Sequence, residues 1–264
     1  GTPYFDAMGP YPLFFCEHWE NLTDDLNNLS EQLISVSMVV GPFSDIPLDD
    51  YNQYFEVLYP YKDHYILDTS LPLIESISKH GRIDARRALK DVTVEHRVSP
   101  DIDLDEWVDL YHHLIIRHNI SGIRAFSRES FAKQLAIPNT HYFRAVHNGE
   151  VVAGNLFYIQ DNVAYGHLLA ITPLGYKFGA SHANKWVAIQ HLSKTIRWIS
   201  YGGGTVKNGA KKNGLDAFKL GWSNTIRKSY FIGKVMQKEI YDHLTDVYNQ
   251  SHQKWFPSYR TNDF

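Results

Sequence analysis

The sequence predicts a mixed α/β fold, and the order of its regular segments carries this prediction. Three strand-like segments follow one another at residues 141–147, 151–159 and 163–171, with tight turns between them. A helical segment over residues 180–195 comes next and leads into a fourth strand-like segment at residues 196–201. Because a helix that joins two strands of one sheet connects parallel neighbours, we expect antiparallel and parallel pairs in a single mixed sheet.

Further elements are expected on both sides of this central part. Asp103 followed by Glu106 has the pattern of a capping box and predicts the start of a helix, and Ser127 precedes a shorter helix at residues 128–136. Earlier in the chain we expect strands at residues 33–40, 54–58 and 64–67 and a helix over residues 71–89. Later in the chain we expect a helix at residues 215–220, a strand at 226–235 and a helix at 239–248.

Charge is segregated along the chain, although the formal net charge is only −3. Residues 1–110 hold 7 Lys and Arg against 21 Asp and Glu, whereas residues 175–240 hold 12 against 2. The later segment therefore either meets an anionic ligand, such as a nucleotide or a phosphate, or neutralises the acidic segment through an internal contact. Counts of charge leave both alternatives open.

Composition and missing motifs restrict the class of protein. No apolar run approaches the roughly 18 residues that a membrane span needs, and the first residues lack the pattern of a signal peptide. The one cysteine, Cys16, excludes an internal disulfide framework and fits a reducing compartment, so we expect a cytoplasmic protein. The sequence has no HExxH, Walker A or G-x-S-x-G motif, and we expect no metal.

Several segments resemble one superfamily of acyltransferases. Residues 143–154 look like the β-hairpin of GNAT-fold proteins, and residues 165–170 look like the strand that precedes their donor loop. Residues 214–222, GLDAFKLGW, follow the glycines at 202–204 and are similar to the G-L-x-x-F-K-x-x-[WF] signature of FemAB-like proteins. That group includes the peptidoglycan-bridge aminoacyltransferases. The leading Gln or Arg of a typical acetyl-CoA loop is absent at residues 172–180.

The resemblance implies the fold, the division of the chain and the activity. We expect the acyl-CoA N-acyltransferase (GNAT) fold in its FemAB-like form, with a degenerate first half at residues 1–99 and a catalytic half at residues 100–264. The implied function is transfer of an acyl group to a substrate amine by direct attack. The alternatives are a tRNA-dependent aminoacyltransferase of the FemAB type and a degenerate GNAT-fold binding module without catalysis.

The segment before the long helix is the expected donor site. N–H groups at a helix N-terminus and its partial positive charge suit a pyrophosphate, and glycines let a phosphate approach the backbone. The resemblance implies acetyl-CoA or another acyl-CoA as the donor. An ordinary glycine-rich turn is the alternative. The candidate donor-binding residues are Gly175, Lys177, Gly179, Ala180 and Ser181.

Three residues are candidates for catalysis. Tyr165 and His167 are two positions apart on one expected strand, so they share a face. Histidine suits removal of a proton from the amine near neutral pH, and a tyrosine hydroxyl suits protonation of the leaving group. Packing of both rings against a helix is the alternative. The resemblance assigns Lys219 to stabilising charge on the reacting acyl group, and a surface lysine is its alternative.

A basic stripe is the expected acceptor site. Lys79, Arg82 and Arg86 are spaced at helical intervals and lie on one side of the expected helix, and Phe218 joins them as a candidate substrate-binding residue. A solvated face paired with Glu75 and Asp84 is the alternative. The implied acceptor is a small-molecule or peptidoglycan-precursor-like amine. The basic loop at residues 207–214 either closes over a phosphorylated substrate or is a mobile surface loop.

Overall fold

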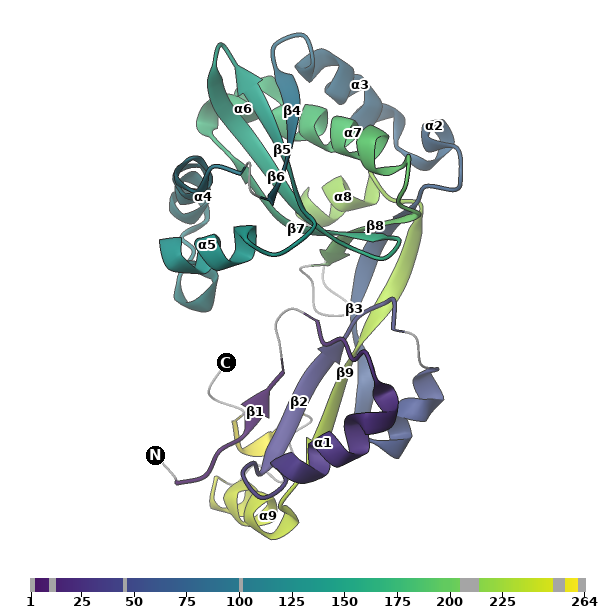
Figure 1. Ribbon diagram of the computed structural model, residues 1–264, viewed down its shortest axis with the longest axis vertical. Helices are drawn as coiled ribbons and strands as arrows, with labels where there is room; N and C mark the ends of the chain where they lie inside the picture. Colours follow the sequence, from purple (N-terminus) through teal and green to yellow (C-terminus); the bar gives the residue numbers. More distant parts are fainter. Residues whose placement is uncertain are drawn as a thin grey trace. The chain divides into compact units, whose positions relative to one another are not determined.

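The computed structural model describes residues 3–9, 13–44, 47–99, 102–204, 214–248 and 255–260. The chain forms two compact units (Figure 1). The first comprises Gly1–Asp63 with Arg227–Phe264, and the second comprises His64–Ile226. This division differs from the expected boundary between residues 99 and 100, because the chain leaves the first unit and returns to it near its end. The expectation that residues 1–99 are a degenerate copy of the fold in residues 100–264 stays a prediction.

The first unit is a small sheet with helices. Its strands are β1 (Ala7–Met8), β2 (Ser35–Val40) and parts of β9 (Thr225–Val235) and β3 (Val57–Asp68). Strand β1 is parallel to β2, and β2 is antiparallel to β9. The buried side chains of Tyr51, Phe55 and Ile232 are part of its core. Its helices are α1 (Leu22–Leu29), α9 (Lys238–Val247), η1 (Trp19–Asn21), η2 (Leu48–Gln53) and η5 (Ser258–Arg260).

Strand β3 corrects one expectation from the sequence. Residues 54–58 and 64–67 were expected to form two strands around a turn, but Val57–Asp68 is a single strand of 12 residues. Proline has a fixed φ that extended backbone allows, so Pro60 does not end the strand. The ring of Tyr59 stacks on that of Phe231 with centroids 5.0 Å apart, which favours the extended course of β3.

The second unit contains the expected mixed sheet. In the order of the sheet, the end of β3 is followed by β8 (Trp198–Gly203), β7 (Val163–Ile171), β6 (Glu150–Gln160), β5 (Thr140–His147) and β4 (Thr93–Val98). Strands β7 and β8 are parallel, whereas all the other neighbours are antiparallel. The predicted α/β class with a mixed sheet is confirmed.

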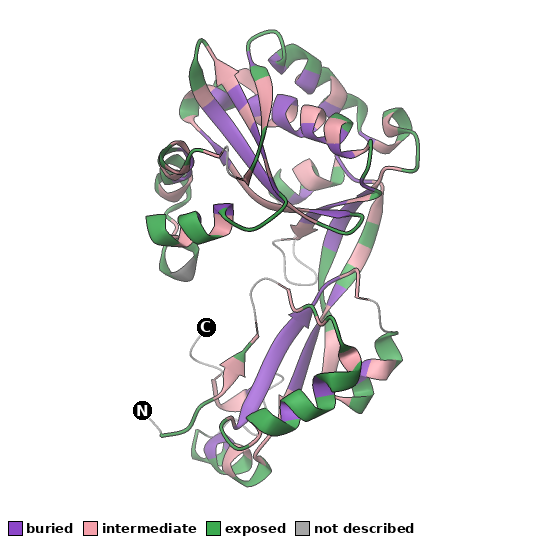
Figure 2. Ribbon diagram, viewed as in Figure 1, coloured by how far each residue is buried: buried purple, intermediate pink, exposed green. Residues whose placement is uncertain are grey.

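Helices cover both faces of this sheet (Figure 1). Helix α4 (Leu104–His118) and helix α5 (Arg128–Leu135) pack on one face around Trp107, and α7 (Ala180–Leu192) packs on the other around Ile189. Figure 2 shows the buried residues concentrated along the strands between them. No helix within the described ranges is both long and apolar enough to cross a lipid bilayer.

The start of α4 follows the expected cap only in part. The Asp103 carboxylate accepts hydrogen bonds from the N–H groups of Asp105 at 2.9 Å and Glu106 at 3.1 Å. The Glu106 carboxylate does not accept the second hydrogen bond of a capping box, from the Asp103 N–H group. It accepts a hydrogen bond from the buried Tyr142 hydroxyl at 3.0 Å and pairs with Arg144, because a buried hydroxyl requires an acceptor.

The expected helix over residues 71–89 is divided into α2 (Leu73–Ser76) and α3 (Lys79–Ala88). Ile77 between them is extended and buried, and the Ser78 hydroxyl caps α3 by accepting a hydrogen bond from the Gly81 N–H group at 3.1 Å. The Ser78 N–H group donates to the Gly221 carbonyl at 2.9 Å. The start of α3 is therefore fixed by the chain that follows α8 (Gly214–Leu220).

The expected donor loop is helical. Helix α6 (Pro173–Phe178) begins after the Thr172 cap, and Gly179, which has a φ of 65°, separates it from α7. Gly175 lies in α6 against strand β6. A Cβ atom at Gly175 would lie 2.1 Å from the carbonyl oxygen of Val152, so this glycine lets helix and strand approach each other closely.

Substitution of Gly175 tests this packing. We expect Gly175→Ala to lower the free energy of unfolding by about 1–3 kcal/mol, because the added methyl group forces α6 away from β6. Urea denaturation measures the change. Gly214→Ala is the control, because a Cβ there would meet nothing within 4 Å. Equal stability of the Gly175→Ala protein and the wild type would contradict the packing role.

Candidate functional site

Strands β7 and β8 pair over only part of their lengths. Val163, Ala164 and Tyr165 lie opposite residues 198–200 of β8, and the paired register ends there. Strand β7 continues to Ile171, while β8 continues to Gly203, which lies opposite His64 of β3. The two parallel strands therefore stop pairing in the middle of the sheet.

A buried lysine from α7 lies beside the end of this pairing. The Lys185 side chain is 6% exposed, and its Nζ atom lies 3.9 Å from the centre of the Tyr201 ring and 5.4 Å from that of Phe218. Within the described residues it forms no ion pair or hydrogen bond. Burial lowers the pKa of Lys185 to about 7, and the positive charge of Lys219 adds to this effect.

Two further buried polar groups near this lysine lack hydrogen-bond partners within the described residues. They are the Tyr201 hydroxyl and the Nδ1 atom of His182. The His182 ring lies 5.1 Å from that of Phe218, so Phe218 contacts both His182 and Lys185. Burial lowers the pKa of His182; the Asp84 carboxylate opposes that shift, and Lys185 adds to it. Buried polar groups are normally paired, and those left without partners mark a place for ligand or water.

Helix α8 brings the residues of the FemAB-like motif to the same place. The Lys219 Nζ atom donates a hydrogen bond to the Gly203 carbonyl at 2.7 Å, and Phe218 packs against His182 and Lys185. Asp216, one turn earlier, is 1% exposed. Phe218 and Lys219 therefore lie close to Lys185, and the catalytic role of Lys219 stays a prediction.

The basic stripe lies on α3, which packs against this part of the unit through Gly81 and Trp222. Lys79 and Arg86 are exposed, while Arg82 is half-buried and its Nε atom donates to the Ile77 carbonyl at 3.2 Å. Within the described residues, none of these three cations forms an ion pair. The pairing with Glu75 and Asp84 that the alternative interpretation expected is not found in that part of the chain.

Tyr165 and His167 occupy a different environment from Lys219. The His167 Nε2 atom lies 2.8 Å from the Gln134 side-chain oxygen on α5, and its ring packs on Tyr158. His167 thus contacts the helix on the face opposite α7 (Figure 1). Burial lowers the pKa of His167 to about 4. Tyr165 lies at the last position of β7 that pairs with β8. The catalytic roles of both residues stay predictions.

The expected donor residues lie around the junction of α6 and α7. Lys177 is exposed, Ser181 is half-buried, and Ala180 is fully buried in the core. Gly175 packs closely against the Val152 carbonyl. The donor-binding roles of these residues stay predictions. The basic loop at residues 207–213 lies outside the described residues.

Sequence reasoning missed Lys185, His182 and Tyr201 as members of the site. A signal for Lys185 was present, because it precedes Ile189 by four positions and Leu192 by seven. Those intervals place it on the same, apolar side of the helix as Ile189 and Leu192. A lysine on such a face is rare unless a partner or a function keeps it there.

Comparisons with known proteins confirm the fold. The structure of FemX is similar with a TM-score of 0.65 and 13% identity, covering 85% of this chain and 78% of that chain. The C-terminal domain of a putative lysylphosphatidylglycerol synthetase from Agrobacterium fabrum has a TM-score of 0.60 and 14% identity, covering 80% and 72%. L-PGS from Bacillus licheniformis has a TM-score of 0.59 and 14% identity, covering 78% and 69%.

These likenesses establish the architecture. No family model and no curated protein sequence matches the chain. The chain has the GNAT-like fold in its FemAB-like form, as the residues of the GLDAFKLGW motif indicated. At these identities the comparison shows the fold alone.

The buried ammonium group of Lys185 makes stability depend on pH. The folded pKa of about 7 lies below the ordinary value of 10.5, so the unfolded chain binds one proton more between these two pH values. Burial of the Lys185 charge therefore lowers the free energy of unfolding. The whole of this loss is present below pH 7, and it disappears as the pH rises towards 10.5.

We expect Lys185→Met to be more stable than the wild type by on the order of 3 kcal/mol at pH 6.5, and this difference to shrink as the pH rises to 9.5. Urea denaturation at both pH values measures it. The control is Lys133→Met on the exposed surface of α5, which should show little change. A difference that does not depend on pH would contradict burial of a charged lysine.

Proposed function

We propose that this protein is a transferase that moves an acyl or aminoacyl group from an activated donor to a substrate amine. The observation that carries the proposal is the gathering of Lys185, Lys219 and Phe218 at the end of the β7–β8 pairing. Two cations next to an aromatic ring suit an anionic donor and the negative charge that develops during acyl transfer. The uncompensated Lys185 supports a ligand site rather than a purely structural core.

The reaction follows from the chemistry of these groups. The amine nitrogen attacks the carbonyl carbon of the donor, a C–N bond forms, and the C–S bond of a thioester or the C–O bond of an ester breaks. The amine must lose a proton, and Lys185 with a pKa of about 7 suits this role at neutral pH. The proton then passes to the leaving group, which departs with the bonding electron pair.

Lys219 is assigned the stabilisation of charge. Its ammonium group is held beside Gly203 by the hydrogen bond to that carbonyl, so its position is set before substrate binds. A donor placed beforehand at the developing oxyanion lowers the barrier without reorganisation. Phe218 supplies an apolar wall beside Lys185.

The donor we propose first is acetyl-CoA or another acyl-CoA, with its phosphates near the first turn of α7 and the exposed Lys177. A second candidate, an aminoacyl ester of tRNA, is favoured by two observations. Helix α6 replaces the open donor loop, and Lys79, Arg82 and Arg86 are cations without ion pairs within the described residues. Structural neighbours named as lysylphosphatidylglycerol synthetases support an aminoacyl group as the one transferred. The acceptor is proposed to be a small-molecule or peptidoglycan-precursor-like amine.

A binding and transfer experiment separates the donors. The melting temperature is measured with acetyl-CoA, longer acyl-CoAs, free CoA and a mixture of aminoacyl-tRNAs, and the stabilising donor is then incubated with a panel of amines. Mass spectrometry detects the acylated product. Stabilisation and product with either donor support the transferase. Stabilisation without product from any amine indicates a binding module, and no response to any donor contradicts the proposal.

In the transfer assay, we expect Lys219→Met to lower kcat by about 100-fold to 1,000-fold, because the charge that faces the developing oxyanion is lost. Lys133→Met is the matched control and should retain full activity. Circular dichroism checks that the variant is folded, because the bond to Gly203 is lost as well. Undiminished turnover would remove Lys219 from the site.

A further inference from the structure

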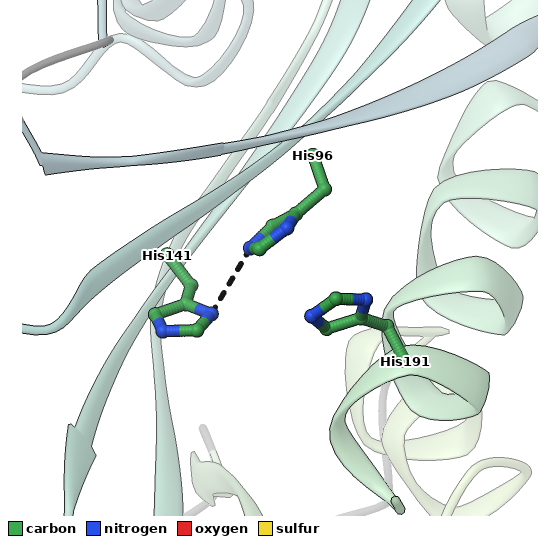
Figure 3. A group of neighbouring side chains, drawn as sticks. All are labelled: His96, His141 and His191. Atoms are coloured by element: carbon green, nitrogen blue, oxygen red, sulfur yellow. Dashed lines mark hydrogen bonds between the residues drawn. The ribbon is translucent and has the colours of Figure 1, made fainter.

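Three histidines from three different elements meet in the second unit (Figure 3). His96 lies on β4, His141 on β5 and His191 at the end of α7. One ring nitrogen of each lies within 4.8 Å of those of the other two, and the His96 Nε2 and His141 Nδ1 atoms are 3.0 Å apart. No residue of the donor and acceptor sites described above belongs to this cluster.

The strand register places two of the histidines on one face. In the antiparallel β4–β5 pair His96 lies opposite Phe143, and His141 is two residues from Phe143 on β5. Side chains two apart on a strand point to the same side, so His96 and His141 share the face that α7 covers. The His96 ring stacks on that of Phe143 with centroids 4.7 Å apart, which fixes its orientation.

The third histidine comes from the helix that crosses this face. The Asn184 side chain on α7 donates a hydrogen bond to the Phe143 carbonyl at 2.6 Å. His191 is seven residues further on, which is about two turns, so it lies on the same side of the helix. Its ring centroid lies 4.1 Å from that of His96. The register of α7 on β5 therefore aims His191 at the other two rings.

Simple packing does not explain this arrangement. All three rings retain some exposure, with His191 the most exposed. Only one hydrogen bond joins the three, and within the described residues His191 forms none. No carboxylate in that part of the chain forms an ion pair with any of them. Three imidazoles with nitrogens turned towards one space have the chemistry of a ligand set for a borderline metal ion.

We propose that His96, His141 and His191 bind one divalent transition-metal ion of the Zn²⁺ class. Ligand nitrogens at about 2.0–2.1 Å from zinc are about 3.3 Å apart in a tetrahedral site. The 3.0 Å between His96 and His141 is close to this value, and the wider separations close by rotation of the exposed His191 side chain. Three imidazoles leave the fourth position to water or to a further ligand.

The bound ion would join the edge strand β4, its neighbour β5 and the last turn of α7. The expectation from the sequence that the protein holds no metal rested on the absence of closely spaced motifs such as HExxH. Ligands contributed by two strands and a distant helix have no such spacing. Hard ions such as Mg²⁺ and Ca²⁺ prefer oxygen ligands and should not bind here.

Metal titration of the full chain without an affinity tag tests the proposal. The protein is stripped with EDTA, dialysed and titrated with ZnCl₂ by calorimetry and with CoCl₂ by visible absorption. We expect one equivalent of zinc per chain, a higher melting temperature with zinc, and the visible bands of four-coordinate Co²⁺. MgCl₂ should change none of these readings.

Single substitutions assign the ion to the cluster. His141→Ala and His191→Ala should each weaken zinc binding at least about 100-fold and remove the Co²⁺ bands. His113→Ala on the exposed surface of α4 is the matched control and should bind as the wild type does. If His141→Ala does not fold, His191→Ala at the helix end still tests the site. Zinc binding that survives His191→Ala, or is absent from the wild type, overturns the proposal.

Discussion

The ammonium group of Lys185 lies in the interior of the second unit without a carboxylate partner in the described residues, and the proposed site depends on this arrangement. Taking a charge out of water costs several kcal/mol unless another charge compensates it. The Tyr201 ring beneath Nζ returns part of this cost through a cation–π contact, while the nearby positive charge of Lys219 increases it. An anionic ligand beside Lys185 would compensate its charge.

The fold provides this environment through the order of its strands. The parallel pair β7–β8 ends at Tyr165 and Ser200, and β8 continues beside β3 alone. Beyond that point Tyr201 and Gly203 face helices α7 and α8 rather than a complete sheet. Helix α7 supplies Lys185 towards β8 and His191 towards β4 and β5, so one helix joins the proposed transfer site to the proposed metal site.

Sequence patterns were sufficient for most of the second unit. Strong alternation and the Asn148-Gly149 turn, where both residues have positive φ, defined the meander, and the local caps at Asp103 and Ser127 placed two helices. The errors have physical causes. The break at Ile77 depends on the distant Gly221 carbonyl, and the continuity of β3 through Pro60 depends on Phe231. Neither contact is visible in a local window of sequence.

Sequence patterns predicted only part of the candidate site, because the rest depends on contacts between segments that are distant in the chain. Phe218 and Lys219 lie in a contiguous motif, whereas Lys185, His182 and Tyr201 join them only through the packing of α7 and β8. The histidine cluster has no signal in the sequence at all. Its members are far apart in the chain and meet only through strand register and helix orientation.

The proposed site depends on a buried Lys185 amino group that lies next to Lys219 and has no carboxylate partner in the described residues. Its direct test is an NMR titration of the labelled Lys185 side chain, assigned by its loss in Lys185→Arg. The account predicts a midpoint at about pH 7, and a higher midpoint in Lys219→Met, where the neighbouring positive charge is gone. A midpoint near the ordinary value of 10.5, unchanged by Lys219→Met, would contradict it.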